Sequence, residues 1–217
     1  MGLYFFGNIS RLHILIMLMI YTKIYRNNVS DILLKTRDHC TGHVYLLNIN
    51  RNLILGHNEK HDNVCSFGGF RNSGETLMET ITREFREETL DCVLPYDVLE
   101  KMLLEKSVII TRTSIKGQHY TVFCNADDHD FDLEKINHKF KNALTDPDLT
   151  PDQMENDQIV MVNLDVVADA IRQNESSTKI IVVPDITNSD CKIRDINVPA
   201  YKWFIESLTN NNLDDIF

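Results

Sequence analysis

The chain has 217 residues, with a hydrophobic fraction of 43% and a charged fraction of 25%, as is ordinary for a globular protein. Its 22 Lys and Arg stand against 32 Asp and Glu, which gives a formal net charge of −10. This acidic balance argues against sequence-independent binding to DNA or long RNA, because such binding depends on Lys and Arg that neutralise phosphates. The length suffices for one sizeable core with an appended segment.

The five cysteines are odd in number and include no Cys-x-x-Cys pair. This pattern argues against a disulfide framework and against a zinc site. Reduced thiols are typical of a cytosol-like compartment, so we expect a cytoplasmic protein.

Residues 1–40 are expected to form an N-terminal extension to a domain over residues 41–217. Residues 1–60 hold seven Lys and Arg against three Asp and Glu. This basic segment could contact RNA, although an incidental charge asymmetry explains it equally well.

An apolar run from Leu12 to Tyr21 lies in this extension and is broken only by His13. Its ten residues are too few to span a bilayer, which needs about 20, and no small-residue cleavage site follows. We therefore expect a buried element and no stable membrane insertion. A start site at Met17 or Met19 is the second interpretation, and a weakly membrane-associating segment is the third.

Apolar periodicity and turn residues predict the order of elements along the rest of the chain. The first part is expected to hold strands at 43–49, 52–56 and 64–67, followed by a helix at about 75–89 with Ser73 as its capping residue. The second part is expected to hold a hairpin of 103–112 and 119–125 around Lys116-Gly117, a polar loop over 126–157 with a helical piece near 133–144, a strand at 159–164, a short helix to about 171, a strand at 179–184 and a closing helix at 199–209.

The predicted helix at 75–89 follows a glycine turn, Gly68-Gly69, and carries three carboxylates, Glu84, Glu87 and Glu88. A helix turns by about 100° per residue, so these three side chains lie close together. Like charges at this spacing repel, and the helix gains no stability from them. Oxygen ligands gathered in this way suit Mg²⁺ or Mn²⁺, ions that usually act on phosphates. The pattern predicts a metal site.

Two further charged residues are expected to support this site. Glu84 and Glu88 flank the apolar stripe of the helix, and carboxylates at the edge of a buried face need a cation or hydrogen bonds. Arg83 is expected to bind Glu75 and thereby fix the glycine turn against the helix. The alternative is a solvated helix face on which Glu79 and Arg83 form an ordinary pair.

The spacing Gly, five residues, Glu, seven residues, Arg-Glu-apolar-x-Glu-Glu resembles the Nudix box of the Nudix hydrolases. The matching residues are Gly69, Glu75, Arg83, Glu84, Phe85, Glu87 and Glu88. The resemblance is specific over residues 69–88 and loose over about 41–172, and it implies an α/β protein, an α/β/α sandwich with a mixed β-sheet.

The end of the box departs from the family pattern. The family has a glycine and then an apolar residue where this chain has Leu90 and Asp91. A glycine tolerates positive φ there, so we expect this helix to end by another route or to run longer.

The resemblance implies hydrolysis of a diphosphate linkage assisted by Mg²⁺ or Mn²⁺. The Gly69 carbonyl would bind the metal with Glu84, Glu87 and Glu88, and Glu84 and Glu87 are catalytic candidates. Family members often recruit a further acidic residue from a later loop. Glu155 is the first candidate for that catalytic role and Asp157 the second, and Glu134, Asp127 and Asp128 are weaker alternatives.

Substrate contacts are harder to assign from the sequence. Arg71 could bind phosphate, since a guanidinium suits phosphate geometry, whereas Arg86 is expected to face solvent. Phe70 could stack on a base, and Phe67, Tyr96 and Tyr120 are further aromatic candidates.

Two substrate classes and one different kind of function follow from the resemblance. A small nucleotide such as ADP-ribose is preferred, and hydrolysis of the mRNA cap is the alternative. Abundant Asn, Ile and Lys residues suggest an AT-rich genome. Together with the divergent box and the N-terminal extension, they resemble features of Nudix proteins of large DNA viruses, for which the host cytoplasm would be the location. Because Leu90 and Asp91 depart from the box, a non-catalytic nucleotide-binding module is the third possibility.

Overall fold

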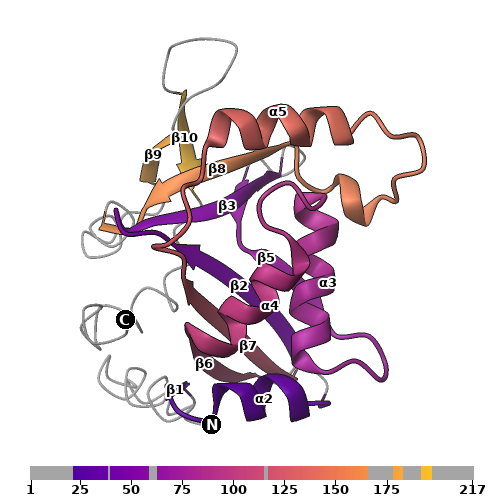
Figure 1. The fold of residues 1–217 in the computed structure, drawn as a ribbon, viewed down its shortest axis with the longest axis vertical. Helices are drawn as coiled ribbons and strands as arrows, with labels where there is room; N and C mark the ends of the chain where they lie inside the picture. The colour runs from indigo at the N-terminus through magenta and orange to yellow at the C-terminus, as the bar shows by residue number, and fades with distance from the viewer. Residues whose placement is uncertain are drawn as a thin grey trace, which may run out of the picture.

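A mixed eight-stranded sheet organises the chain in a computed structural model, which describes residues 22–38, 40–58, 63–114, 117–165, 178–182 and 192–196 (Figure 1). The strands are β1 (Thr22–Tyr25), β2 (Cys40–Leu47), β3 (Asn52–Asn58), β4 (Asn63–Cys65), β5 (Phe67–Phe70), β6 (Ser107–Ser114), β7 (Gly117–Asn125) and β8 (Gln158–Asn163). Their order is β1-β6-β7-β2-β3-β4, with β5 paired to β2 and β8 paired to β3.

The centre of the sheet is the parallel pair of β2 and β7, in register from Cys40 opposite Gln118 to Leu47 opposite Asn125. All the other strand pairs of this sheet are antiparallel. A separate antiparallel pair is formed by β9 (Thr178–Val182) and β10 (Lys192–Ile196).

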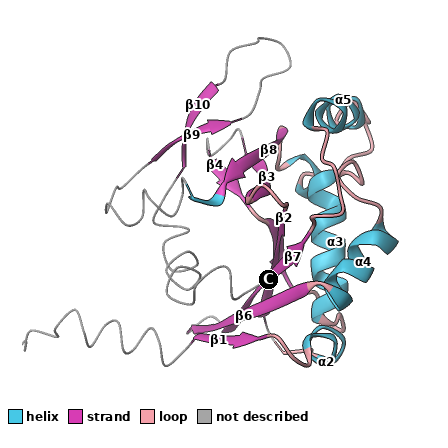
Figure 2. Cartoon of the chain, turned by 60° about the vertical axis from the view of Figure 1, so that its left-hand side comes forward, coloured by secondary structure: helices cyan, strands magenta, loops and turns pink. Residues whose placement is uncertain are grey.

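Helices cover one face of the sheet (Figure 2). They are α2 (Val29–Lys35), α3 (Leu77–Thr89), α4 (Tyr96–Glu105) and α5 (Leu133–Ala143), and a single 3-10 turn, η2 (Asp152–Met154), follows α5. The predicted α/β class with a mixed sheet is confirmed. The closing helix predicted at 199–209 lies outside the described residues, so the second helical layer of the expected sandwich stays a prediction.

Helix α3 forms because its sequence places apolar side chains on one face. Leu77, Met78, Ile81 and Phe85 recur at helical spacing, and all four are buried. The Phe85 ring packs edge-on against Phe67 of β5, with the ring centroids 5.1 Å apart. This contact fixes α3 beside β5, the strand that contains Gly68 and Gly69.

The N-terminal end of α3 is capped by Thr76, and not by Ser73 as the sequence predicted. The Thr76 hydroxyl accepts a hydrogen bond from the Glu79 N–H at 3.2 Å, and the Glu79 carboxylate accepts one from the Thr76 N–H at 2.6 Å. This reciprocal capping box satisfies two backbone donors that the helix itself leaves unpaired. The helix therefore starts at Leu77, two residues later than expected.

The C-terminal end of α3 also differs from the expectation. The helix ends at Thr89, and Leu90 adopts the left-handed conformation that a glycine would favour, with φ of 50°. Asp91 follows with φ of 54°. A residue with a side chain costs roughly 1–2 kcal/mol in this region. Packing of Leu90 against the core and an ion pair between Arg86 and Asp91 accompany this end.

Several other elements depart from the sequence-based expectations. Residues 103–105, expected in a strand, end helix α4, which begins after Pro95 and buries Leu99, Met102 and Leu103. The predicted strand at 64–67 is two strands, β4 and β5, separated at Ser66. The turn expected at Gly68-Gly69 is wrong, because both glycines lie within β5, opposite His43 and Gly42 of β2. The hairpin is confirmed, with Ser114 opposite Gly117.

The described part of the N-terminal region belongs to the same sheet and core. Strand β1 pairs with β6 along the sheet edge, and α2 buries Val29 and Leu33 among the core residues. Neither element was predicted, and neither was β10. The apolar run from Leu12 to Tyr21 falls outside the described residues. The short helix expected to reach residue 171 falls outside them after residue 165. Among the described helices, none combines the length and the apolar character needed to cross a membrane.

Replacing Thr76 with alanine should destabilise the protein by about 1 kcal/mol, because α3 loses its capping box. Urea unfolding at neutral pH measures this change, and the melting temperature should fall by about 2–4 °C. Ser73→Ala is the matched control, since Ser73 is exposed and lies outside the helix. An equal loss for both variants would contradict the assignment of Thr76 as the cap.

Candidate metal centre and catalytic site

Strand β5, which contains Gly68 and Gly69, and helix α3 bring three of the predicted metal-binding residues together, namely Gly69, Glu84 and Glu88. The Gly68 N–H donates a hydrogen bond to the Glu88 carboxylate at 3.0 Å. The Glu84 carboxylate lies directly against Gly69, where an added Cβ would be 2.5 Å from Oε1. A glycine at position 69 is therefore required for the carboxylate of Glu84 to approach the backbone of β5.

Glu88 is a buried carboxylate, with 6% of its surface exposed. Burial raises its pKa well above the ordinary value, the Gly68 N–H opposes this shift, and the charges of Glu84, Glu155 and Glu87 add to it. Burial likewise raises the pKa of Glu84, with Arg83 opposing and Glu87 and Glu155 adding. The hydrogen bonds from the Gly68 N–H and from Arg83 do not fully offset the effects of burial and of the neighbouring carboxylates on Glu84 and Glu88.

Arg83 connects β5 and the loop that follows it to its own helix, α3. Its Nε donates to Glu75 Oε1 at 2.8 Å, as the sequence predicted, and its NH2 group donates to the Phe70 carbonyl at 3.0 Å. The same guanidinium lies 2.8 Å from Glu87 Oε2 and 2.9 Å from Glu84 Oε1. Although burial opposes it, the bond to Arg83 holds the pKa of Glu75 at about 2.

The shared guanidinium affects how the carboxylates can bind a metal ion. Within the described ranges, no three His, Cys, Asp or Glu side chains converge on a single metal position. Glu84 and Glu87 would have to turn from Arg83 towards an ion beside Glu88. The chemistry of the donors nevertheless fits Mg²⁺ or Mn²⁺, because they are carboxylate oxygens, and a cation would offset the burial and the repulsion that raise the pKa of Glu88.

Glu155 is the later acidic residue that the fold brings to this cluster. It follows η2, which packs against α3, and its charge contributes to the raised pKa values of Glu84 and Glu88. Asp157, the second candidate, instead binds the buried His57 through Oδ1.

The weaker acidic candidates have other surroundings. Asp127 accepts a hydrogen bond from Asn125 at 3.1 Å, and Asp128 pairs with Lys106. Glu134 lies in the first turn of α5. These contacts favour Glu155 among the acidic residues considered.

The predicted substrate contacts differ in their surroundings. Arg71 donates to the main-chain carbonyls of Asp38, Asn72 and Glu75 at 2.7–2.9 Å, so this side chain fixes the loop, and its contact with phosphate stays a prediction. Phe70 is 61% exposed beside Gly69 and is accessible for stacking.

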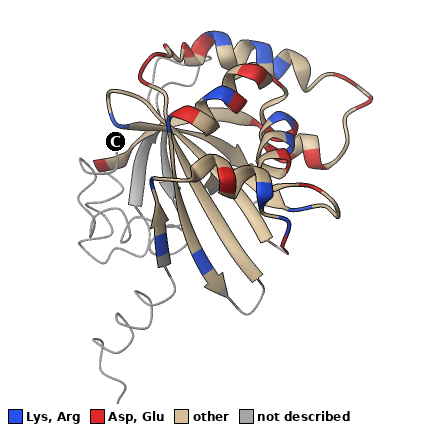
Figure 3. Ribbon diagram, turned by 60° about the horizontal axis from the view of Figure 1, so that its bottom comes forward, with Lys and Arg blue, Asp and Glu red and all other residues tan. Residues whose placement is uncertain are grey.

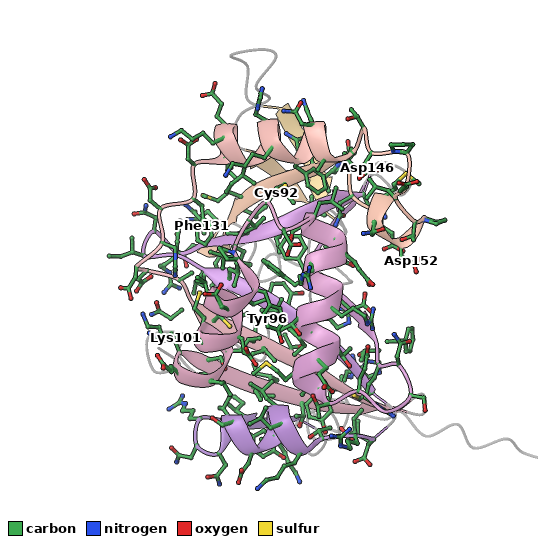
Figure 4. The ribbon with its side chains drawn as sticks, turned by 45° about the vertical axis from the view of Figure 1, so that its right-hand side comes forward. Cys92, Tyr96, Lys101, Phe131, Asp146 and Asp152 are labelled. Atoms are coloured by element: carbon green, nitrogen blue, oxygen red, sulfur yellow. The ribbon has the colours of Figure 1, made fainter. Side chains whose placement is uncertain are left out.

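A cleft of about 900 Å³ runs along the outer side of α3. Glu75, Arg83 and Glu87 line it, and so do Tyr96 of α4 and Asp146 of the loop after α5, two residues labelled in Figure 4. Acidic and basic residues alternate along the helices around it, while most strand residues are uncharged (Figure 3). Of the predicted metal ligands, Glu87 is among the described residues that line this cleft, whereas Gly69, Glu84 and Glu88 are not.

Arg86 lies in this cleft and is half exposed, as expected from the sequence. It pairs with Asp91 at 2.9 Å, and its guanidinium carbon is 5.9 Å from the centre of the Tyr96 ring. This arrangement was not predicted from the sequence, and neither was the contact between His57 and Asp157. Buried polar residues outside a motif carry no periodic signal by which to recognise them.

Comparison with known proteins gives only weak similarities. No protein-family model matches the chain. No curated protein matches it. A bifunctional NMN adenylyltransferase/ADP ribose pyrophosphatase of Francisella tularensis, complexed with AMP and a Mn ion, is similar at 19% identity and a TM-score of 0.32. The similarity covers 46% of this chain and 32% of that one, so the chain spans about a third of that protein.

Two smaller proteins are also similar in structure. A hydrolase of the NUDIX family from Clostridium perfringens has 12% identity and a TM-score of 0.34, over 62% of this chain and 87% of that chain. A mutT/nudix family protein from Listeria innocua has 12% identity and a TM-score of 0.33, over 82% and 99%. Scores of this size do not establish a shared fold, and the function proposed below rests on the residues of the site.

The bond between Glu75 and Arg83 predicts a pH dependence of stability. A carboxyl with a folded-state pKa of about 2 contributes stability that is present above its ordinary pKa of 4.5 and is lost as the pH falls towards 2. The contribution at neutral pH is up to about 3 kcal/mol. Glu75→Gln should remove it, so urea unfolding from pH 6 to pH 2.5 should show a shallower decline for the variant.

The matched control is Glu105→Gln, which removes one negative charge at an exposed position at the end of α4. Its stability should follow that of the wild type across the same pH range. Parallel curves for the wild type and Glu75→Gln would show that the Glu75–Arg83 bond contributes no net stability.

Proposed function

We propose that the chain is a pyrophosphohydrolase that cleaves a diphosphate linkage joining a nucleoside to another group, with Mg²⁺ or Mn²⁺ as cofactor. One observation carries the proposal, namely that the buried Glu88 and the partly buried Glu84 lie together against Gly68 and Gly69 of β5. A fold seldom buries carboxylates together unless a cation compensates them. The spacing of the motif and the adjoining cleft support the same interpretation.

Glu84, Glu87, Glu88 and the Gly69 carbonyl would hold the ion. When bound, a divalent ion polarises a phosphoryl oxygen and lowers the pKa of a water molecule. Hard oxygen donors are the ligands that such ions take in proteins.

The protein's own groups would position the reactants. Glu155, which is exposed and directly follows η2, would accept the proton of the attacking water. Arg83 and Glu75 hold the end of β5 against α3, so that Gly69 and Glu84 keep their close approach. These groups must be fixed, because misplacement by about 1 Å can cost on the order of 100-fold in rate.

A small nucleotide, such as an ADP-ribose-like compound, is the substrate that fits best. The cleft of about 900 Å³ lies within the range of small-ligand sites. Phe70 is not among the described residues that line this cleft, but it offers an exposed ring for a base, and Arg71 lies next to it in the sequence. Hydrolysis of capped RNA is the alternative within the same chemistry.

A non-catalytic binding module is the alternative of a different class. It was motivated by Leu90 and Asp91, which depart from the motif after Glu88. Because Leu90 takes the left-handed conformation in place of a glycine, α3 still ends directly after Thr89. The departure leaves Glu84 and Glu88 against β5, which favours an active enzyme.

Glu87→Gln should abolish turnover while the protein stays folded. We expect at least about a 100-fold loss of kcat, because an electrostatic group at the reacting centre is removed. The assay follows products from ADP-ribose, NADH, dinucleoside polyphosphates, nucleoside triphosphates and capped RNA with Mg²⁺ or Mn²⁺. Glu105→Gln is the control and should turn over substrate at the wild-type rate.

The outcomes of this assay separate the proposals. Two phosphorylated products from one small nucleotide, lost in Glu87→Gln, would establish the hydrolase. Cleavage of capped RNA alone would replace the small nucleotide as substrate. If folded, metal-bound wild type cleaves nothing in the panel, the pyrophosphohydrolase proposal fails and the binding module takes its place.

Phe70→Ala should raise KM for the substrate about threefold to tenfold, because a stacking surface for the base is lost. The kcat value should change little, since Phe70 is exposed and its proposed role is to bind the base and not the reacting phosphates. Phe70→Tyr keeps the aromatic face and should restore KM. An unchanged KM for Phe70→Ala would remove Phe70 from the substrate site.

A further inference from the structure

The segment that carries Glu155 is held in place by the two residues that follow it, Asn156 and Asp157. Asn156 is 2% exposed, although it is an amide in a loop between η2 and β8. Its Nδ2 donates to the main-chain carbonyl of Glu88 at 3.3 Å. The amide side chain therefore ties the Glu155 segment to the last turn of α3, where a predicted metal ligand lies.

Gly56 of β3 forms the niche that receives the Asn156 amide. A Cβ at position 56 would lie 2.5 Å from both Cγ and Nδ2 of Asn156 and 2.6 Å from Oδ1. Since all three atoms belong to one buried side chain, no residue larger than glycine leaves room for it. The Cys65 thiol, 3.8 Å from Asn156 Oδ1, closes the niche from β4.

Asp157 provides a second, independent attachment. Its N–H donates to the His57 carbonyl at 2.9 Å, and its carboxylate binds Nδ1 of the His57 ring, which is almost fully buried. Backbone and side chain of Asp157 thus both bind the same residue of β3. Glu155 itself remains exposed beside the carboxylates of α3.

We propose that Asn156 and the His57–Asp157 pair are positioning residues, which hold Glu155 at the carboxylate cluster so that it can act as the general base. This inference rests on the proposed function and deepens it. A buried amide with a dedicated niche and a buried imidazole bound to the next residue fix the backbone on the C-terminal side of Glu155. The base can then be exposed to substrate without being free to move away from it.

Kinetics of Asn156→Ala test this role first. We expect kcat to fall about 10- to 100-fold, as is typical when a group that orients a metal-site residue is removed. The KM value should stay within about twofold of the wild-type value, as expected for a substitution that is independent of the substrate-binding residues. Gly56→Ala should reproduce the loss of kcat, because its Cβ would displace the Asn156 side chain.

A double-mutant cycle with Glu155→Gln separates positioning from general destabilisation. If Asn156 acts through Glu155, then adding Asn156→Ala to Glu155→Gln should change kcat by less than about twofold. Asn137→Ala is the matched control. Asn137 is also a buried amide, and it binds both backbone groups of Ile159 in β8 at 2.7 and 2.8 Å. Its effect on kcat should be the same in both backgrounds.

Hydrogen exchange of the metal-free protein gives a readout that does not depend on turnover. In Asn156→Ala the amides of residues 155–158 should exchange at least about tenfold faster, because local opening there becomes easier. Asp157→Ala serves as a second variant if Asn156→Ala does not fold, since Asp157 is partly exposed. It should show the same faster exchange and the same loss of kcat.

Three results would overturn the inference while leaving the proposed function intact. They are an unchanged kcat for Asn156→Ala, an equal loss of kcat with and without Glu155, and unchanged exchange at residues 155–158. A Glu155→Gln variant with wild-type kcat would also overturn it, since there would be no base to position. Absence of turnover by the wild type would instead refute the proposed function on which the inference rests.

Discussion

The guanidinium of Arg83 links the parts of the site that sequence separates. Through hydrogen bonds to the Phe70 carbonyl and to Glu75, it binds the end of β5 and the loop that follows this strand. Through Glu84 and Glu87, it also binds the acidic face of its own helix. A delocalised, planar cation with five donors can do this, whereas a lysine at the same place could not reach so many partners at once. The positions of the carboxylates relative to β5 depend on this one side chain.

Arg83 and a bound divalent ion would compete for the same carboxylates. Arg83 and a divalent ion would both draw the carboxylates of Glu84 and Glu87, while Glu88 is held apart by burial and by the Gly68 N–H. The guanidinium keeps the cluster folded without a metal, because it offsets part of the repulsion between like charges. Binding of an ion would then exchange one cation for another and would require no new backbone arrangement.

The motif and the helices were predictable where a periodic or spaced signal exists. The apolar stripe of α3, the Glu75–Arg83 bond and the limits of α5 followed from spacing alone. Helix α4 was missed because its strongly apolar end, at Met102 to Leu104, reads equally well as the start of a buried strand. The contacts of His57 and Asn156 could not be predicted, since they depend on elements that meet only in the folded chain.

The parallel pairing of β2 with β7 has a consequence for how the chain is made. Partners in this pair, such as Thr41 and His119, are separated by 78 residues. At a synthesis rate of about 5–20 residues per second, β7 leaves the ribosome several seconds after β2. During that interval β2 can pair with β3 and β5, but its other edge has no partner among the described strands. The nascent chain therefore exposes an apolar strand edge until the middle of the protein has been synthesised, and this is the stage at which a chaperone would be most useful.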